Sequence, residues 1–372
     1  MLTKSYRLIL VLASATLVFV GPAWPGNVPP SMGSEAVPPL SAQMVRVFPE
    51  RIYKVPDPGR AYTESWIASV IVGEPSQKLE PKKLEVRFFS KGKLLDTQIF
   101  EAAAVQVLPR DIWKLSAATP TVSPRRLFHI ESSFDLHLRF SLPRSFETDE
   151  MQITVSVADD KQDVLALPPV RVAVEVYAQK TRLIFPWTGP GMMSQGWFNN
   201  GGHGGQSSWF AGDFLGLTPD TWGPQLRNED QNDAYAGYNR EVIAPAAGII
   251  VAMRNDVPLN TRVNEEPPNE FFMALHDPIE ALLGNYLVID HGNGEFSAIS
   301  HLNIGSISVK VGDRVVQGQP IGKVGNTGSS NSPHLHFELL DGPRPFVSNG
   351  LPFQFSNLNV GRLDRGTYFT TR

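Results

Sequence analysis

The stretch with the most chemical potential is SPHLHFEL, at residues 332–339. Its apolar residues alternate with His334, His336 and Glu338, a pattern typical of a β-strand with one buried face. Side chains two residues apart on a strand point the same way, so the two imidazoles would stand side by side. One could ligate a metal while the other reaches a nearby water. Two surface histidines on an ordinary amphipathic strand are the alternative, so other motifs must decide.

Four more motifs precede this stretch. They are NYLVIDHGNG at 285–294, ISHL at 299–302, VGDRVVQGQPIG at 311–322 and GNTGS at 325–329. In this order the motifs resemble those of the lysostaphin/LytM-like zinc metallopeptidases, which cleave peptidoglycan peptides. The resemblance runs from Val242 to Glu338, and the ordered set is far more specific than any single motif.

That family coordinates one zinc ion through an early His, an Asp and the second His of His-x-His, with a water in the fourth position. The resemblance therefore makes Asp213 and His336 zinc ligands, and His301 and His334 the catalytic pair. Three protein ligands and one open position are typical of catalytic zinc. The two unligated histidines would orient or deprotonate the water, stabilise the oxyanion and protonate the leaving amine. The sequence does not divide these roles between them.

The early His departs from the family spacing. The family places it four residues before the Asp, where this chain has Trp209. The nearest upstream candidate is His203, ten residues before Asp213 in a glycine-rich stretch whose backbone freedom permits a longer loop. We predict His203 as the third ligand, with His276 as a second candidate. If neither reaches the metal, the site has lost a ligand.

Other polar residues near these motifs have weaker claims. His291 lies in the HGNG turn and is interpreted as structural. Asp290 and Glu338 could orient histidines from behind or be solvated. Asn285 could shape a substrate groove or serve only in a turn.

Alternation with period two also dominates residues 42–178, which predicts strands with one buried face. The inward series are Leu84, Val86 and Phe88; Phe134, Leu136, Leu138, Phe140 and Leu142; Met151, Ile153, Val155 and Val157; and Val170, Val172, Val174 and Val176. Turn signals such as Lys91-Gly92 separate these strands and favour an immunoglobulin-like β-sandwich without long helices. His129 and His137 are interpreted as structural or surface residues there.

Residues 181–345 are also strand-like, with a polar stretch at 254–283 that resembles an insertion. Together the two regions predict an all-β chain: an N-terminal Ig-like β-sandwich followed by a peptidase domain. The resemblance implies that the second domain is an antiparallel β-sheet of LytM type with an open groove. Residues 346–372 form a C-terminal tail without a recognisable motif.

The N-terminal 23 residues have the features of a secretory signal peptide. Lys4 and Arg7 precede an apolar run from Leu8 to Val20, and the small residues Gly21 and Ala23 follow. The run is shorter than the ~20 residues of a membrane-spanning helix, although an uncleaved anchor is the rival interpretation. Residues 24–41, rich in Pro, Gly and Ser, are interpreted as a linker.

Composition narrows the functional classes. The 372 residues include no cysteine, which excludes disulfides, thiolate zinc sites, cysteine nucleophiles and a lipoprotein anchor. A net charge of -4 offers no long-range attraction for nucleic acid. The hairpin motif at 311–322 also occurs in biotinyl and lipoyl carriers, but Lys323 lacks the sequence setting of a modified lysine.

We therefore predict an exported metalloendopeptidase, periplasmic or extracellular, that hydrolyses peptide bonds in peptidoglycan with one zinc ion per chain. Its partner is peptidoglycan, not nucleic acid, and no stable membrane insertion is expected after signal removal. The alternative is a catalytically inactive relative that binds the cell wall or regulates a hydrolase, and an adhesion scaffold would leave the clustered histidines unexplained. The bond cut, the role of the N-terminal domain and the oligomeric state are not specified by the sequence.

Overall fold

The computed structural model describes fifteen stretches of the chain. These are residues 45–48, 51–56, 62–67, 69–72, 80–101, 138–143, 145–158, 164–197, 203, 207–220, 223–227, 230–265, 267–275, 278–360 and 363–372. All of them belong to a compact unit, Gln43–Arg372, that is separate from Met1–Ala42. The predicted signal peptide and linker, His129, His137 and His276 lie outside the described residues. No helix in the described part of the chain has the length and apolar character needed to cross a membrane.

The N-terminal half of the described chain is built from strands alone. Their bounds are β1 (Val45–Phe48), β2 (Arg51–Pro56), β3 (Tyr62–Ile67), β4 (Ser69–Val72), β5 (Glu80–Ser90), β6 (Lys93–Glu101), β7 (Leu138–Pro143), β8 (Glu150–Ala158), β9 (Val164–Ala166) and β10 (Val170–Glu175). One sheet has the order β6-β5-β8-β10-β2-β3-β7, with β9 beside β8, and β1 pairs with β4 separately. All these pairs are antiparallel except β10–β2, which is parallel.

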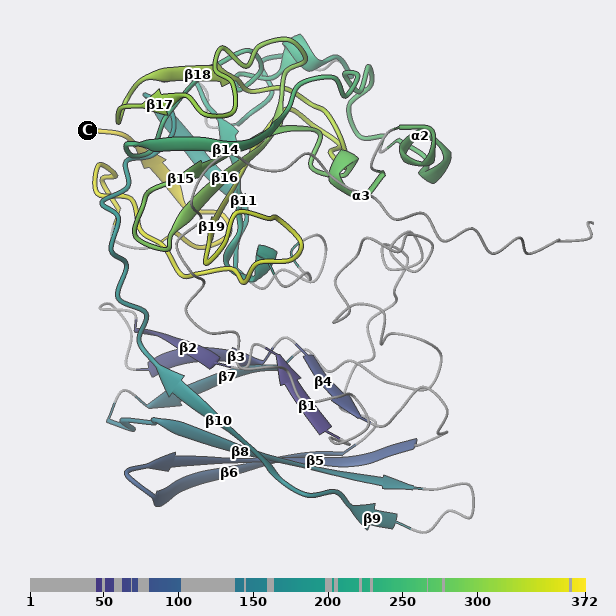
Figure 1. Ribbon diagram of the computed structural model, residues 1–372, viewed down its shortest axis with the longest axis vertical. Coiled ribbons are helices and arrows are strands. Elements are labelled where there is room, and N and C mark those ends of the chain that lie inside the picture. Colours follow the sequence, from purple (N-terminus) through teal and green to yellow (C-terminus); the bar gives the residue numbers. More distant parts are fainter. Residues whose placement is uncertain are drawn as a thin grey trace, which may run out of the picture. The chain divides into compact units, whose positions relative to one another are not determined.

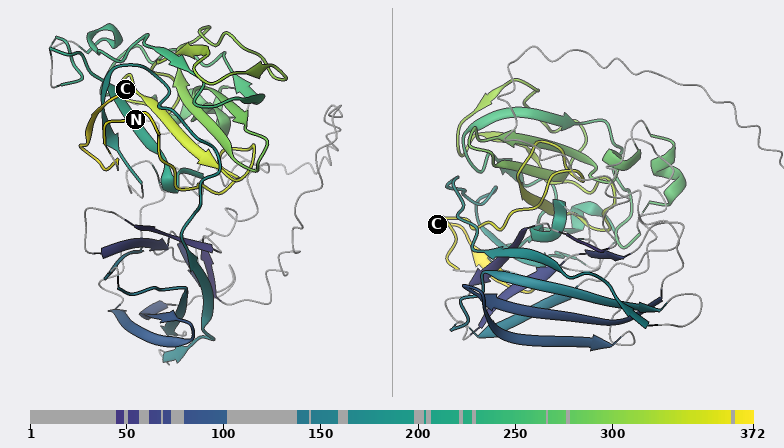
Figure 2. Two further views of the ribbon diagram at one scale, coloured as in Figure 1. Left: turned by 90° about the vertical axis from the view of Figure 1, so that its left-hand side faces the viewer. Right: turned by 60° about the horizontal axis from the view of Figure 1, so that its bottom comes forward.

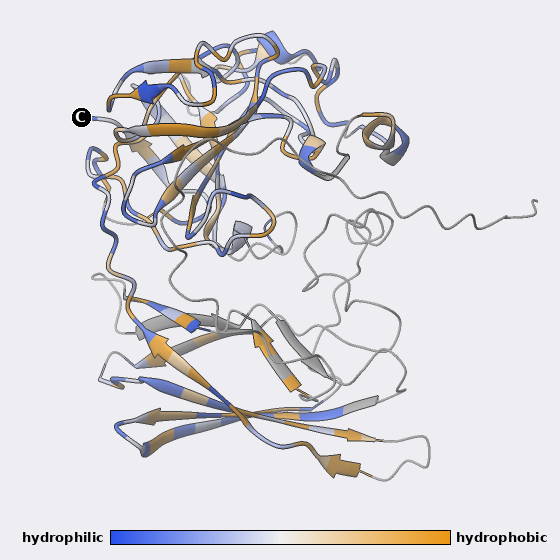
Figure 3. Cartoon of the chain, in the orientation of Figure 1, coloured by the Kyte–Doolittle hydropathy of each residue, from blue (hydrophilic) through white to orange (hydrophobic). Residues whose placement is uncertain are grey.

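A single hydrophobic cluster fills the space between the strands in the lower half of Figure 1. Every second residue of β5 and β8 is almost fully buried, from Leu84 to Phe88 and from Met151 to Val157, and Figure 3 shows the resulting alternation of orange and blue along these strands. The Lys91-Gly92 turn is confirmed, because both residues have positive φ angles of 48° and 77°. Val176 is 53% exposed, so its predicted inward orientation is wrong. The strand ends at Glu175, and the alternation ends with it.

The C-terminal half holds a second sheet and a few short helical turns. Their bounds are β11 (Pro190–Gln195), η4 (Ser207–Phe210), β12 (Gly212–Gly216), η5 (Asn232–Ala234), β13 (Glu241–Ile243), β14 (Gly248–Arg254), α2 (Asn269–Met273), α3 (Pro278–Ala281), β15 (Asn285–Asp290), β16 (Phe296–Leu302), β17 (Arg314–Val315), β18 (Pro320–Lys323), β19 (Leu335–Leu340) and β20 (Tyr368–Thr370). The order of the sheet is β17-β14-β15-β16-β19-β12-β11-β20, and all its pairs are antiparallel. β15, β16 and β19 run side by side in its centre (Figures 1 and 2). The prediction of a mostly β protein is confirmed.

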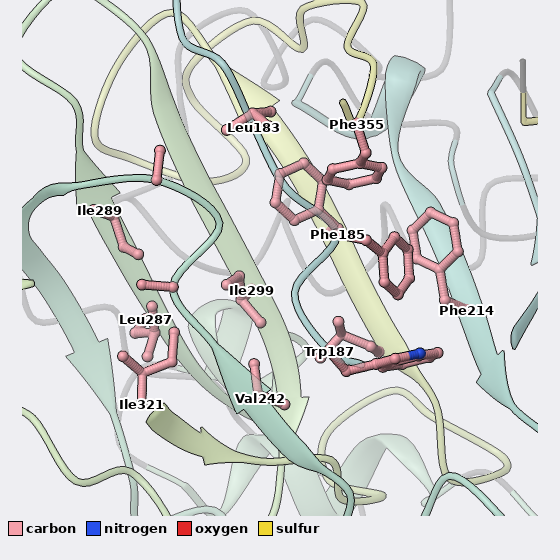
Figure 4. Close-up of a cluster of buried hydrophobic side chains, with 14 of the residues drawn as sticks. Leu183, Phe185, Trp187, Phe214, Val242, Leu287, Ile289, Ile299, Ile321 and Phe355 are labelled. Atoms are coloured by element: carbon pink, nitrogen blue, oxygen red, sulfur yellow. The ribbon is translucent and has the colours of Figure 1, made fainter. Parts of the chain in front are cut away.

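One face of this second sheet packs against an aromatic core (Figure 4). Phe185 lies at its centre, with ring centroids 4.8 Å from Trp187, 4.9 Å from Phe214 and 4.5 Å from Phe369. The residues after 345 take part, since Leu351, Phe353, Phe355, Leu358 and Phe369 all belong to the cluster. Hydrophobic burial therefore ties the C-terminal tail to the sheet, although its sequence carries no motif.

Strand alternation assigns the two faces of the sheet. Phe214 in β12 and Phe337 in β19 point into the core, so their neighbours Asp213 and His336 point away from it. The sequence thus places its polar side chains on the face opposite the core. The site is built on that face.

Truncation of the central ring tests this core. We expect Phe185→Ala in the full chain to lower the free energy of unfolding by about 3–5 kcal/mol, because it removes a fully buried ring and leaves a cavity. Urea denaturation measures the change. Val316→Ala is the control, since Val316 is 66% exposed and should change stability by less than about 0.5 kcal/mol. Equal effects of the two substitutions would contradict the assignment of the core.

Candidate metal centre

The site begins with a cross-strand pair. β12 and β19 are antiparallel neighbours, and their register places Asp213 directly opposite His336. His336 Nδ1 lies 2.8 Å from Asp213 Oδ1, although the two residues are 123 positions apart in sequence. Both side chains are buried, with exposed fractions of 6% and 7%.

His203 completes a group of three. Its Nδ1 lies 3.0 Å from the carbonyl oxygen of Gly196, so we assign the ring proton to Nδ1, and Nε2 carries a lone pair. Nε2 is buried, finds no hydrogen-bond partner among the described residues and lies 3.2 Å from Asp213 Oδ2. Ligand atoms of His203, Asp213 and His336 all lie within 4.8 Å of one another. Two imidazole nitrogens and a carboxylate fit the requirements of a zinc ion, and the lone pair on His203 Nε2 has no other partner among the described residues.

Two further histidines flank this group. The ring centroid of His301 lies 4.7 Å from that of His334 and 5.6 Å from that of His336. His301 Nδ1 donates to the carbonyl of Thr327 at 2.8 Å, and His334 Nδ1 donates to that of Ser332 at 2.7 Å. A carbonyl can only accept, so each ring carries its proton on Nδ1 and leaves Nε2 as a base. His334 Nε2 lies 3.6 Å from Asp213 Oδ1, beside the group of three.

His301 reaches the site through an irregular backbone. Its φ angle is +61°, in the left-handed region that non-glycine residues rarely adopt. The pairing of β15 with β16 also shifts register at this point, between Asn285 and Leu287. Ser300 lies opposite His336 in the ladder, so regular alternation would turn the next residue to the other face. The bulge and the strained φ explain how His301 instead meets His334 and His336.

Burial and charge set the protonation of the metal-free group. Burial opposes ionisation of Asp213, but the neighbouring His203 and His334, with a hydrogen bond from His336, hold its pKa well below the usual range. Burial likewise disfavours the charged form of His336, but its hydrogen bonds to Asp213 and Glu338 raise its pKa to about 10. Burial lowers the pKa of His301 and of His334, so both rings are neutral at pH 7.

Glu338 supports His336 from the far side. His336 Nε2 donates to Glu338 Oε1 at 3.0 Å, which leaves Nδ1 facing Asp213. Glu338 is 2% exposed, and Ser207 Oγ lies 3.4 Å from the same oxygen. Ser207 in turn accepts the backbone N–H of Phe346 at 3.1 Å. Of the two carboxylates weighed from sequence, Glu338 contacts a site histidine, whereas Asp290 accepts from the N–H of Gly292 in a turn.

Other polar residues singled out from sequence lie outside the group. His291 bonds the carbonyl of Ala247 and the hydroxyl of Ser297, each at 2.8 Å. Asn285 is fully buried and bonds the backbone of Val257, which favours a structural role. Trp209, at the family's usual His position, is 3% exposed in η4.

Comparison with known proteins gives a family for this arrangement. Residues 230–347 match the sequence profile described as "Peptidase family M23". This part of the chain is therefore similar to the M23 peptidases. The match includes His301, His334 and His336 and begins after His203 and Asp213.

Named relatives match this chain only over short stretches. A peptidoglycan DD-endopeptidase, ShyA of Vibrio cholerae serotype O1, is 40% identical over 103 residues, which cover 28% of this chain and 22% of the relative. Glycyl-glycine endopeptidase ALE-1 of Staphylococcus capitis is 35% identical over 84 residues, 19% of this chain and 23% of the relative. This chain therefore spans less than a quarter of the length of either relative.

Solved structures are more distantly similar. A zinc-containing peptidase from Vibrio cholerae has 14% identity and a TM-score of 0.27, with 81% of this chain and 86% of that chain covered. The catalytic domain of lysostaphin from Staphylococcus simulans has 21% identity and a TM-score of 0.24, with 43% and 86% covered.

The surroundings of His291 predict a pH effect on the stability of this protein. Burial lowers its pKa from 6.5, so the unfolded chain binds a proton more readily than the folded chain does. Its contribution to stability is present above about pH 6.5 and is lost as pH falls through the lower folded pKa. We expect the wild type to lose more unfolding free energy than His291→Gln between about pH 7.5 and about pH 5.5. Denaturation curves at both values measure this, and parallel losses would refute the structural role.

Proposed function

We propose that this chain is an exported zinc-dependent endopeptidase that hydrolyses peptide bonds in peptidoglycan cross-links or stem peptides. The observation that carries the proposal is the buried group of His203, Asp213 and His336, with two neutral histidines beside it. Three protein ligands would leave the fourth position of a tetrahedral zinc ion open for a water or substrate. His203, Asp213 and His336 are the proposed ligands of one zinc ion per chain, and His301 and His334 are the proposed catalytic residues.

The chemistry follows from the positions of the nitrogen atoms. A bound zinc ion supplies Lewis-acid polarisation of a carbonyl and lowers the pKa of a coordinated water to about 7. His301 and His334 each present an unprotonated Nε2, because their protonated Nδ1 atoms donate to the carbonyls of Thr327 and Ser332. Either ring can therefore take a proton from the attacking water and return it to the leaving amine. Glu338 keeps His336 Nδ1 directed at Asp213 and the metal position.

Peptidoglycan is proposed as the substrate from the relatives. One relative is named a peptidoglycan DD-endopeptidase and the other a glycyl-glycine endopeptidase. Both names describe peptide hydrolysis, and they differ in the bond. Directly cross-linked and glycine-bridged fragments are therefore the two substrates to compare.

Export is the proposed context of the activity. Residues 1–23 have the features of a signal peptide, and residues 24–41 those of a linker. We further propose residues 42–178 as an Ig-like β-sandwich domain, 181–345 as the peptidase domain and 346–372 as its tail. The mature protein would lie in the periplasm or outside the cell.

A non-catalytic regulator of a cell-wall hydrolase is the second candidate. It depends on the loss of a ligand, and the long spacing between His203 and Asp213 was the only sign of such a loss in the sequence. The 3.2 Å separation of His203 Nε2 and Asp213 Oδ2 favours the enzyme, because the longer loop still brings the imidazole to the carboxylate.

Metal content and cleavage test this function together. We expect the purified full chain to hold about one zinc ion and to release fragments from peptidoglycan, with both properties abolished by a chelator and lost in His203→Ala. His291→Ala is the matched control, since it removes a histidine outside the group and should retain zinc and activity. Elemental analysis and chromatography of the released fragments are the measurements. Zinc without cleavage of either fragment type would favour the regulator.

Protonation of His336 predicts a second result. Its pKa of about 10 means that the metal-free ring holds two protons at pH 7, and a ligand nitrogen must lose its proton. Zinc binding near pH 7 should therefore release about one proton, measurable by titration calorimetry in buffers of different ionisation enthalpy. Glu338→Gln removes a carboxylate that raises this pKa, so the variant should release fewer protons. Heats that are independent of buffer would show that His336 is already neutral.

A further inference from the structure

Four buried polar residues outside the metal group form a connected amide cluster. Asn232, Asn260, Asn326 and Ser330 are 6%, 7%, 0% and 2% exposed. They come from three segments: η5, the polar stretch after β14, and residues 326–330, which begin in the GNTGS motif before β19. None of them is a candidate metal ligand. Buried amides are costly unless their hydrogen bonds are satisfied, so the bonds of the cluster indicate what it holds in place.

The members of the amide cluster form hydrogen bonds to one another. Asn326 Nδ2 donates to Asn232 Oδ1 at 2.8 Å, and Ser330 Oγ donates to Asn326 Oδ1 at 2.7 Å. Asn232 Nδ2 donates to the carbonyl of Asn260 at 2.6 Å. Each residue is thereby fixed by at least one other member.

Asn260 links the amide cluster to the 326–332 loop by hydrogen bonds. Its Nδ2 donates to the carbonyls of Gly328 and Ser330, at 3.0 Å and 2.8 Å. Its backbone N–H donates to the carbonyl of Asn326 at 2.8 Å. A single residue of the polar stretch thus holds three carbonyls of the 326–332 loop, those of residues 326, 328 and 330.

The 326–332 loop also holds both proposed catalytic rings. The carbonyl of Thr327 accepts from His301 Nδ1, and that of Ser332 accepts from His334 Nδ1. The Thr327 carbonyl lies between two carbonyls that Asn260 holds, and the Ser332 carbonyl follows the last of them by two residues. In addition, Ser330 Oγ lies 3.3 Å from His334 Nδ1, so one member of the cluster contacts a histidine ring directly. A shift of the loop would turn both imidazoles together.

Close backbone packing also supports the loop, as do hydrogen bonds from the N–H of Ser329 to the carbonyl of Leu282 and from Thr327 Oγ1 to the carbonyl of Leu302. Gly328 has a φ angle of +77°, and a Cβ atom there would overlap the backbone of Gly284. This contact fixes how near the loop comes to β15. It does not fix the rotation of individual carbonyls, which hydrogen bonds from donors such as Asn260 must set.

We infer that Asn260 is a positioning residue: with the amide cluster, it orients the 326–332 loop so that Thr327 and Ser332 aim His301 and His334 at the metal group. Asn260, in the polar stretch at 254–283, then supports the loop that orients the proposed catalytic histidines. This inference rests on the proposed function for the roles of those histidines. The orientation of their rings does not depend on it.

Asn260→Asp in the full chain tests the inference. The two side chains have nearly the same volume, but an ionised Asp cannot donate to the carbonyls of Gly328 and Ser330. We expect kcat on a soluble cross-linked peptidoglycan fragment to fall about 10- to 100-fold, as misplacement of catalytic groups by about 1 Å would cause. KM and the zinc content should stay close to the wild-type values.

A spectroscopic signature separates positioning from general destabilisation. Nitrogen NMR of the zinc-loaded chain, labelled at histidine, distinguishes protonated from unprotonated ring nitrogens, and His301→Gln and His334→Gln assign the signals. We expect the Nδ1-protonated form of both rings in the wild type and a mixture in Asn260→Asp. Ser330→Ala is a milder second variant that should affect His334 alone.

Asn357→Ala is the matched control. Its Oδ1 accepts the N–H of Phe185, away from the amide cluster, so the variant should lose stability but keep kcat and the ring signals. Unchanged kcat and ring signals in Asn260→Asp would overturn the inference, as would a fall in kcat that follows loss of zinc. If the wild type binds zinc but cleaves no fragment, the proposed function fails, while the ring signals still decide whether Asn260 orients the histidines.

Discussion

The register between β12 and β19 is the constraint on which the rest of the site depends. It sets Asp213 opposite His336 on the polar face while Phe214 and Phe337 enter the core. A shift by one residue would exchange these faces and bury the carboxylate among phenylalanines. The aromatic core around Phe185 therefore stabilises the candidate metal centre indirectly, because the packing that buries the rings also fixes which side chains face the site.

Around this pair, backbone carbonyls do much of the orienting. The carbonyls of Gly196, Thr327 and Ser332 each accept a hydrogen bond from the Nδ1 of one histidine. In each of these three histidines the Nε2 carries the lone pair. His336 is the exception. Its Nε2 donates a hydrogen bond to the carboxylate of Glu338, so Nδ1 is the nitrogen that faces Asp213. A carboxylate strengthens a ligand by increasing the electron density on its ring. The kind of acceptor does not divide the two proposed roles, because His203, a proposed ligand, is held by a carbonyl as His301 and His334 are.

Much of the fold could be predicted from alternation alone. Met151 to Val157 and Leu84 to Phe88 are buried as the period of two requires, because sheet burial depends directly on that period. Val176 was misplaced because alternation continues in the sequence beyond the residue where the strand ends. The contribution of Phe353 and Phe369 to the core could not be predicted, since isolated aromatic residues in a tail show no period.

By itself the sequence determined the chemistry of the site: the residue types, the absence of cysteine and the shared face of His334 and His336, because these follow from composition and from local strand geometry. Only the tertiary structure decided how distant segments meet. It brought His203 to Asp213 despite a spacing longer than that of the family, and the left-handed φ angle of His301 turned its ring towards His334. It also joined Asn232 and Asn260 to the 326–332 loop. Such contacts join residues far apart in the chain through loops and bulges, and no local period records them.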